Sequence, residues 1–503
     1  MNEQIFTYQT RFQLDEIGST ILEECAQLFN KVEHSLFAEI ARGKTSASCK
    51  NGFLKKYGIT ARQFNACRVN IDAKIAACQA GQQNALISLK EKIATADRQI
   101  AKLTKKPSKH FVIHQKKRRK FSLTHRYSQL QNDQAKKKVR LCFGSKKLFR
   151  AQFHLEENGF SSHEEWKKDW TTSRSNEFFV LGSKDETAGN QTCTAILNQD
   201  GSISLRLRLP PVLAQKYGKY IHINNLTFAY GHQAILASIH DPEGTAISYR
   251  FKKDSKSWRI FVSTSLQRPI QITQTGIGVI GIDLNTDHIA CVETDHFGNP
   301  IKKQIFSWVS YGKSKNQLKA ATSEISKQII EWALRTKKPI IIEKLDFQKK
   351  KLALKEQRNK KLARMLSSFA YGLFFQSLLS QSYRKGISIH QVNPAFTSII
   401  GRVNYARRYG LSIHLAAALC IARRYQQFSE SPNLSTKKIP DGKGCHVAFD
   451  PPARNRTKHV WHFWGQVKKK TTVHEAHFRA RKHRSSDPPS SIPVTEIPEE
   501  LLA

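Results

Sequence analysis

The sequence lacks the long apolar run that a membrane-spanning helix needs. No uninterrupted hydrophobic stretch approaches about 18 residues. The opening stretch MNEQIFTYQTRFQLDE also lacks the apolar core that is typical of a signal peptide. We therefore expect a cytoplasmic protein.

Paired cysteines and phosphate-binding loops are also missing. The nine cysteines are scattered from Cys25 to Cys445, and no two of them form a CxxC pair. An odd number at irregular spacing fits neither a disulfide framework nor a cysteine zinc ribbon, so reduced and mostly buried thiols are expected. The Gly-Ser-Lys turns do not have the spacing of a phosphate loop, which disfavours a nucleoside triphosphatase.

Acidic residues are scarce relative to basic ones. The 503 residues include 82 Lys and Arg against 40 Asp and Glu, which gives a formal net charge of +42. So large a charge repels itself strongly unless an anionic partner neutralises it. Nucleic acid is the expected partner. A length of 503 residues allows two to four domains, and a hydrophobic content of 39% is enough to bury their cores.

The pattern of apolar and polar residues changes along the chain, and the order of these patterns predicts an α+β multidomain protein. Residues 1–16 contain an alternating strand, and residues 17–135 have helical periodicity. Short β-like runs separated by turn residues fill 136–272, as in a barrel or open sheet. Strands and helices alternate over 276–428, which predicts an α/β domain with a mixed sheet. The basic, His-, Ser- and Pro-rich segment 429–503 is expected to be largely disordered.

Two carboxylates at strand ends are the first candidates for chemistry. Asp283 ends the apolar strand in VIGIDLN, and Glu343 follows three isoleucines in PIIIEKLDF. A carboxylate beside a buried strand must be paired, protonated or bound to a metal ion. The plainer alternatives are a turn-forming Asp and a Glu paired with Lys344. Taken together, the two residues suggest oxygen ligands for Mg²⁺ or Mn²⁺ in phosphodiester hydrolysis.

The stretches GIDLN, IIIEKLDF, VNPAFTS and the Ala-rich helix HLAAALCI resemble the RuvC motifs of TnpB-like proteins. These are transposon-encoded, RNA-guided nucleases of the OrfB family, related to type V CRISPR effectors. The resemblance covers about 276–425. It implies a wedge-like β-barrel with a helical recognition insertion, followed by an RNase H-like RuvC domain. It also implies guide RNA and double-stranded DNA with a short flanking motif as partners, in a prokaryotic cell and at the nucleoid.

His414 is the main departure from that family. The third motif normally carries an Asp, and aligning HLAAALCI with it places His414 there, as a candidate third metal ligand or acid–base group. A histidine ligand favours Mn²⁺ over Mg²⁺. The plainer alternative is a core histidine whose ring hydrogen-bonds to the backbone. The family's four-cysteine zinc ribbon is replaced by the basic connector IIGRVNYARRYGL. Asp287, His288 and Asp346 lie near the same motifs and are alternative site residues, although each fits a turn or surface position equally well.

Three functions stay open on these grounds. The resemblance implies a metal-dependent DNA endonuclease with Asp283, Glu343 and His414 as both catalytic and metal-binding residues. The substituted third motif is also compatible with a nuclease-inactive RNA-guided binder that acts as a repressor or targeting factor. A transposase that acts without guide RNA is the third alternative.

Candidate nucleic-acid contacts are spread over the chain. By resemblance, the basic helix 348–385 lies against the guide–target duplex, where its cations would neutralise phosphates. Gln63 and Asn65 carry amides able to read adenine edges, and the plainer alternatives for them are a helix surface or an N-cap. The full candidate set is Arg62, Gln63, Asn65, Lys116, Lys117, Arg118, Arg119, Lys349, Lys350, Lys351, Arg358, Lys360, Lys361, Arg364, Arg402, Arg407 and Arg408.

Overall fold

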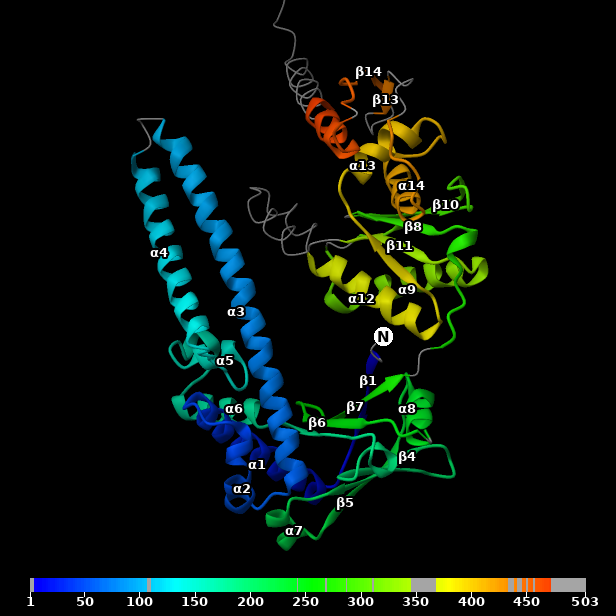
Figure 1. The fold of residues 1–503 in the computed structure, drawn as a ribbon. Coiled ribbons are helices and arrows are strands. Elements are labelled where there is room, and N and C mark those ends of the chain that lie inside the picture. Colours follow the sequence, from blue (N-terminus) through cyan, green and yellow to red (C-terminus); the bar gives the residue numbers. More distant parts are fainter. Residues whose placement is uncertain are drawn as a thin grey trace, which may run out of the picture. The chain divides into compact units, whose positions relative to one another are not determined.

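The computed structural model divides into two compact units, residues 1–267 and 268–503 (Figure 1). The structure describes residues 4–105, 110–241, 243–266, 269–285, 287–309, 312–344, 368–432, 438–440, 446–448, 451–455 and 457–471. Several separate sheets and many helices make the chain an α+β protein. Within those ranges no helix combines the length and apolar character needed to cross a membrane.

The first unit combines two antiparallel sheets with a group of helices. Its first strand pairs along its whole length with the last strand of the unit, in the order β1-β7-β6-β2, and the other sheet has the order β3-β4-β5. The strands are β1 (Gln4–Phe12), β2 (Glu177–Val180), β3 (Cys193–Leu197), β4 (Ile203–Arg208), β5 (Tyr220–Leu226), β6 (Ile247–Lys253) and β7 (Trp258–Leu266). Closure of these strands into a barrel stays a prediction.

Two long helices of the first unit, α3 and α4, run side by side as a hairpin (Figure 1). The helices are α1 (Glu16–Ala41), α2 (Ser46–Tyr57), α3 (Ala61–Thr104), α4 (His110–Ala135), α5 (Lys146–Ala151), α6 (His163–Arg174), α7 (Pro211–Tyr217) and α8 (His232–Ile239). Helices therefore continue beyond the predicted limit at residue 135. Ser145 and Ser162 are the N-caps of α5 and α6, and their side chains accept hydrogen bonds from backbone N–H groups. A serine before a helix is a local signal, and the prediction of β-like structure for 136–272 did not use it.

The second unit is built on a five-stranded mixed sheet of order β10-β9-β8-β11-β12. The pairs β10–β9 and β9–β8 are antiparallel, whereas β8–β11 and β11–β12 are parallel. Its elements are β8 (Ile280–Leu284), β9 (His288–Thr294), β10 (Pro300–Ser307), α9 (Lys315–Thr336), β11 (Ile340–Glu343), α12 (Ser368–Arg384), β12 (Ile389–Val392), α13 (Thr397–Ile400), the π-helical turn η5 (Gly401–Ala406), α14 (Ile413–Tyr425), β13 (Lys438–Pro440) and β14 (His446–Ala448).

Helices cover both faces of this sheet (Figure 1). Side chains alternate between the faces along a strand. Ile280, Ile282, Ile340 and Ile342 pack with α9 and α12 in one core, while Ile341 packs with α14 on the opposite face. The carboxylates two residues beyond Gly281 and Ile341 therefore belong to the α14 face.

Part of the C-terminal segment differs from the predicted disorder. Residues 460–471 form a helix, and Phe463, Trp464 and Val467 are buried against α14 and η5. The indole of Trp464 also donates to the backbone carbonyl of Glu430, 2.9 Å away. The helix was not predicted because the segment is polar overall. Three buried apolar side chains are nevertheless enough to pack it against the unit.

Candidate active site

Asp283 lies at the carboxyl end of β8 and is 7% exposed. The amide of Asn285, two residues further on, donates to Asp283 Oδ2 over 3.0 Å. The strand fixes the backbone and the Asn285 amide fixes one oxygen. Asp283 is thus a rigidly held, nearly buried carboxylate.

Glu343 ends the neighbouring strand, and the register places it beside Asp283. In the β8–β11 pair, Ile341 lies opposite Gly281 and Ile342 opposite Ile282, so the next step brings Glu343 level with Asp283. Residues level with each other on adjacent strands point to the same face. The hydroxyl of Thr397, at the start of α13, donates to Glu343 Oε1 over 2.5 Å.

α14 brings His414 over this pair of strands. A Cβ on Gly281 would lie only 2.2 Å from the carbonyl oxygen of Ala418, so glycine allows the helix to approach the strand closely. The rise along the helix axis between His414 and Ala418 is about 6 Å. The rise along the strand between Gly281 and Asp283 is similar, about 6.6 Å. The matching distances place His414 Nδ1 3.4 Å from Asp283 Oδ2.

The surroundings of His414 favour its charged form. The hydrogen bond to Asp283 raises the pKa of His414 above its ordinary value, against the opposing effect of burial, and the charges of Asp283 and Asp287 act in the same direction. The ring of His288 lies edge-on to that of His414, with 4.5 Å between the centroids. His288 Nδ1 is itself 2.8 Å from Asp287 Oδ1. The alternative residues Asp287 and His288 therefore adjoin the site.

A tight turn positions Thr397, which the sequence analysis did not single out. Phe396 adopts a left-handed backbone conformation with φ of 62°. Arg424, near the end of α14, donates to the carbonyl oxygens of Asn393 and Ala395 and holds the turn. The signal was present in VNPAFTS, where an Asn-Pro pair before a Thr predicts a turn that ends in a helix start.

The donor chemistry of the site fits a divalent ion only in part. Asp283 and Glu343 supply the carboxylate oxygens that Mg²⁺ and Mn²⁺ prefer. However, no three His, Cys, Asp or Glu side chains converge as a metal site within the part of the chain that the structure describes. His414 Nδ1 faces Asp283 instead, so the arrangement favours two carboxylate ligands with His414 beside them.

Gln63 does not have the base-reading position that we predicted. It is 3% exposed, its Oε1 accepts from the backbone of Thr60, and its own backbone donates to Thr60 Oγ1. This is a capping box that starts α3. Arg62 is paired with Glu186 at 2.8 Å, and Asn65 is partly buried. The stretch ITARQFNA thus forms a helix start.

The predicted cations of α4 are mostly available to a partner. Lys117, Arg118 and Arg119 are exposed, whereas Lys116 donates to Gln99 over 2.8 Å. In the second unit, Arg407 and Arg408 are exposed at the end of η5 and Arg402 is partly buried. Outside the described residues lie Asp346, Lys349, Lys350, Lys351, Arg358, Lys360, Lys361 and Arg364.

No protein-family model and no curated protein matches this chain. Among solved structures, the chain is similar to Thermus thermophilus RuvC in complex with a Holliday junction substrate. The TM-score is 0.22 at 16% identity, over 31% of this chain and 98% of that chain. It is also similar to Cas12f1 in complex with sgRNA and target DNA, with a TM-score of 0.34 at 12% identity, over 84% of this chain and 99% of the other.

A second Cas12f structure, a CRISPR–Cas12f ternary complex, gives a TM-score of 0.21 at 12% identity, over 83% of this chain and 98% of that chain. The three solved structures described above are thus a RuvC protein and two Cas12f proteins.

Proposed function

We propose that this chain is a metal-dependent DNA endonuclease with a RuvC-like site, directed to its target by a guide RNA and encoded by a transposon. The observation that carries the proposal is that Asp283 and Glu343 end adjacent parallel strands in register, with His414 Nδ1 3.4 Å from Asp283 Oδ2. Two carboxylates on adjacent strand ends form a suitable pair of hard ligands for catalysis of phosphodiester hydrolysis.

The proposed roles follow from the contacts. Asp283 and Glu343 would hold the divalent ion, which supplies an activated water molecule and stabilises charge on the phosphate. Asn285 and Thr397 each orient one carboxylate through a hydrogen bond. His414 has one ring nitrogen 3.4 Å from Asp283 Oδ2, and its imidazole would hold or transfer a proton during hydrolysis.

Charge supports a nucleic-acid substrate and guide. The net charge of +42 exceeds what solubility requires, and Lys117, Arg118 and Arg119 present cations on one exposed helix. Such contacts supply affinity without sequence readout, so base pairing with a guide RNA would supply the specificity. A short flanking motif in the target DNA is part of the proposal, without an assigned reader now that Gln63 is buried.

A second candidate is a guide-dependent DNA binder that does not cut. It is favoured by His414, which contacts Asp283 where an oxygen ligand would be expected, and by the lack of a three-donor cluster among the described residues. In that case the carboxylates would be remnants of a nuclease site, and the protein would act by occupying DNA.

Plasmid cleavage tests the proposal. The purified protein with its co-purified RNA is assayed in Mg²⁺ and in Mn²⁺, as wild type and as Glu343→Ala, His414→Ala and His414→Asp. His296→Ala is the matched control, since His296 is exposed and contacts only Phe297 among aromatic rings of the described chain. Loss of cleavage in both alanine variants, with the control active, supports the nuclease.

Two other results would contradict the guide-directed nuclease and support a different function. Guide-dependent DNA binding without cleavage, with cutting gained in His414→Asp, identifies the nuclease-inactive binder. DNA cleavage that survives complete removal of RNA identifies a nuclease or transposase that needs no guide.

A further inference from the structure

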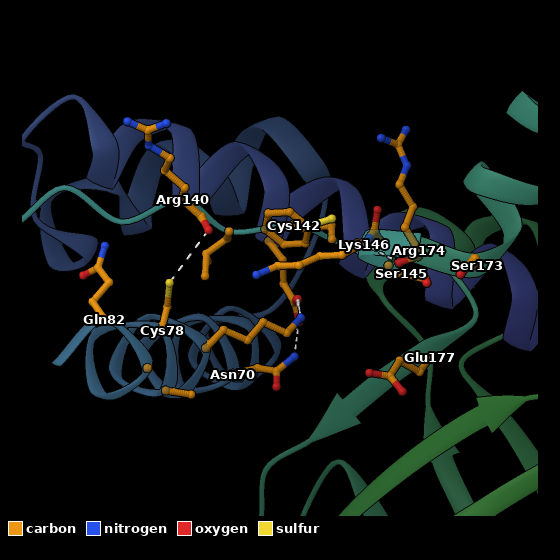
Figure 2. A pocket seen from close by; sticks show the side chains of 18 of the residues that line it. Asn70, Cys78, Gln82, Arg140, Cys142, Ser145, Lys146, Ser173, Arg174 and Glu177 are labelled. Carbon is orange, nitrogen blue, oxygen red and sulfur yellow. Dashed lines mark hydrogen bonds and ion pairs between the residues drawn. The ribbon is translucent and has the colours of Figure 1, made fainter. Parts of the chain in front are cut away.

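The first unit contains a large open cavity, of about 850 Å³, between α3, α4 and the segment that leads into α5 (Figure 2). This volume lies within the range of about 300–1,000 Å³ that is common for small-molecule and cofactor sites. None of the candidate nucleic-acid contacts predicted from the sequence lines it. The cavity is therefore a separate feature that the site in the second unit does not explain.

One wall of the cavity is apolar and formed by small residues. Ala77, Gly81 and Ala85 line it from α3, and their spacing of four residues puts them on one face of that helix. Phe143 and Leu130 add larger apolar surface. A bare inorganic anion would gain nothing from this wall, whereas a flat ring could pack against it.

Cations predominate around the same cavity. Six lining residues are basic and only two are acidic, namely Lys74, Arg126, Arg140, Lys146, Arg174 and Lys252 against Glu33 and Glu177. Both carboxylates are already paired, Glu33 with Lys74 at 2.6 Å and Glu177 with Lys252 at 2.9 Å.

Three of these cations remain uncompensated. Arg140 is paired with Asp133 at 3.2 Å, but Arg126, Lys146 and Arg174 form no ion pair within the described residues. The positive potential extends to His34, whose pKa is lowered by burial first and then by the charges of Arg174 and Lys74. Like charges gathered in one cavity favour an anionic ligand.

The cations differ in where they point. In Figure 2, the side chain of Lys146 extends across the cavity, whereas the guanidinium groups of Arg140 and Arg174 point outward. The amide of Gln82 donates to the backbone of Lys138 and that of Asn70 donates to Glu33, so both amides are held in fixed positions on the wall. The cavity thus has one cation that reaches into it and two that are directed away from it, beside amides in fixed positions.

We propose that this cavity holds one unstacked nucleotide of a bound nucleic-acid strand, with the base against Ala77, Gly81 and Ala85 and the flanking phosphates on Arg126 and Arg174. Lys146 contacts the phosphate of the inserted nucleotide. The inference rests on the proposed nucleic-acid binding but not on cleavage. A base removed from its stack needs a pocket that repays the lost stacking, and an apolar wall with cations beside it does so.

The test fills the cavity without changing its charge. Gly81→Leu is suited to this, because a Cβ at Gly81 would meet no heavy atom within 4 Å. Gly52→Leu is the matched control, since Gly52 is also helical, has the same open surroundings and does not line the cavity. Ala85→Leu is a second filling variant, and helical circular dichroism confirms folding of each protein.

The probe is a short single-stranded RNA with 2-aminopurine at successive positions, together with the DNA of the same sequence, in buffer without divalent ions. The fluorescence of 2-aminopurine rises when the base leaves its stack. We expect a rise at one position with wild type and Gly52→Leu, its loss in both filling variants, and about a tenfold loss of affinity in them. Arg174→Ala should weaken binding and lower the salt dependence by about one phosphate contact.

Each result decides the matter. If wild type binds the strands but no position brightens, or if the filling variants behave as Gly52→Leu does, the cavity proposal is wrong while nucleic-acid binding stands. If wild type binds neither RNA nor DNA, both proposals are wrong. Brightening with RNA alone or DNA alone identifies which strand supplies the nucleotide.

Discussion

Gly281 lies directly under the carbonyl oxygen of Ala418, and an added Cβ would come within 2.2 Å of that oxygen and 2.9 Å of the Ala422 Cβ. A backbone oxygen cannot move aside as a flexible side chain would. The absence of a side chain at this one position therefore sets the distance between α14 and β8, and with it the contact between His414 and Asp283.

Gly281→Ala should destabilise the second unit by about 1–3 kcal/mol, because overpacking forces the helix away from the strand. The change is measured as a lower midpoint of chemical denaturation, followed by tryptophan fluorescence. Gly276→Ala is the control, since a Cβ there meets nothing within 4 Å. Equal denaturation midpoints for the two variants would show that α14 can move away from β8 without loss of stability.

The protonation of His414 should be shifted upward. Because Asp283 raises the folded-state pKa of His414, its stabilising contact is fully present below the unfolded value of about 6.5 and is lost as pH rises through the folded value. Histidine NMR titration in metal-free buffer should give His414 a pKa above 6.5. Asp283→Asn should lower the pKa of His414. An unchanged pKa would show that Asp283 does not interact with His414.

Thr397 should act on cleavage through Glu343. Thr397→Val keeps the shape of the side chain but removes the hydroxyl that donates to Glu343 Oε1. We expect cleavage to fall about tenfold, the effect of losing a hydrogen bond to a charged group, and to require a higher metal concentration. Thr397→Ser should restore both. Equal metal dependence in wild type and Thr397→Val would limit Thr397 to a structural role.

A buried ion pair should stabilise the sheet on its α9 side. Lys338 Nζ lies 2.6 Å from Glu293 Oε1, both side chains are under 10% exposed, and Trp332 donates to the other carboxylate oxygen. Lys338→Met should cost about 3–5 kcal/mol, since it leaves Glu293 buried and unpaired. Lys338→Met with Glu293→Gln should recover much of that loss in the denaturation midpoint. A double variant no more stable than the single one would contradict the pairing.

Gln63 should affect stability and not binding. Gln63→Ala removes half of the capping box that starts α3 and should cost about 1 kcal/mol. Its affinity for nucleic acid should equal that of wild type. Arg118→Ala with Arg119→Ala should show the reverse, with weaker binding and unchanged stability, because both side chains are exposed. A base-reading Gln63 would instead alter sequence preference.

Local signals predicted much of the second unit. The isoleucines before Glu343 predict a buried strand, the apolar run before Asp283 predicts another, and the Ala-rich stretch after His414 predicts a helix in close contact. Each of these features appears in the structure as a separate element. Periodicity and composition act over a few residues, and these elements are regular enough to show them.

Side chains whose roles depend on distant neighbours were predicted less well. The burial of Gln63 comes from the fold, although its capping-box partner Thr60 is only three residues away. Thr397 looked ordinary until the turn at Phe396 directed it to Glu343. The helix at 460–471 was hidden in a polar segment, although Trp464 is fully buried.

Short-range patterns were enough to indicate which residues could carry chemistry, because they give the strand-end positions of Asp283 and Glu343 and the helix position of His414. Their proximity, by contrast, depends on the tertiary fold. The parallel register of β8 with β11 and the close approach allowed by Gly281 bring together residues 60 to 131 positions apart. Such pairings depend on the summed packing of the whole unit, which no local stretch encodes.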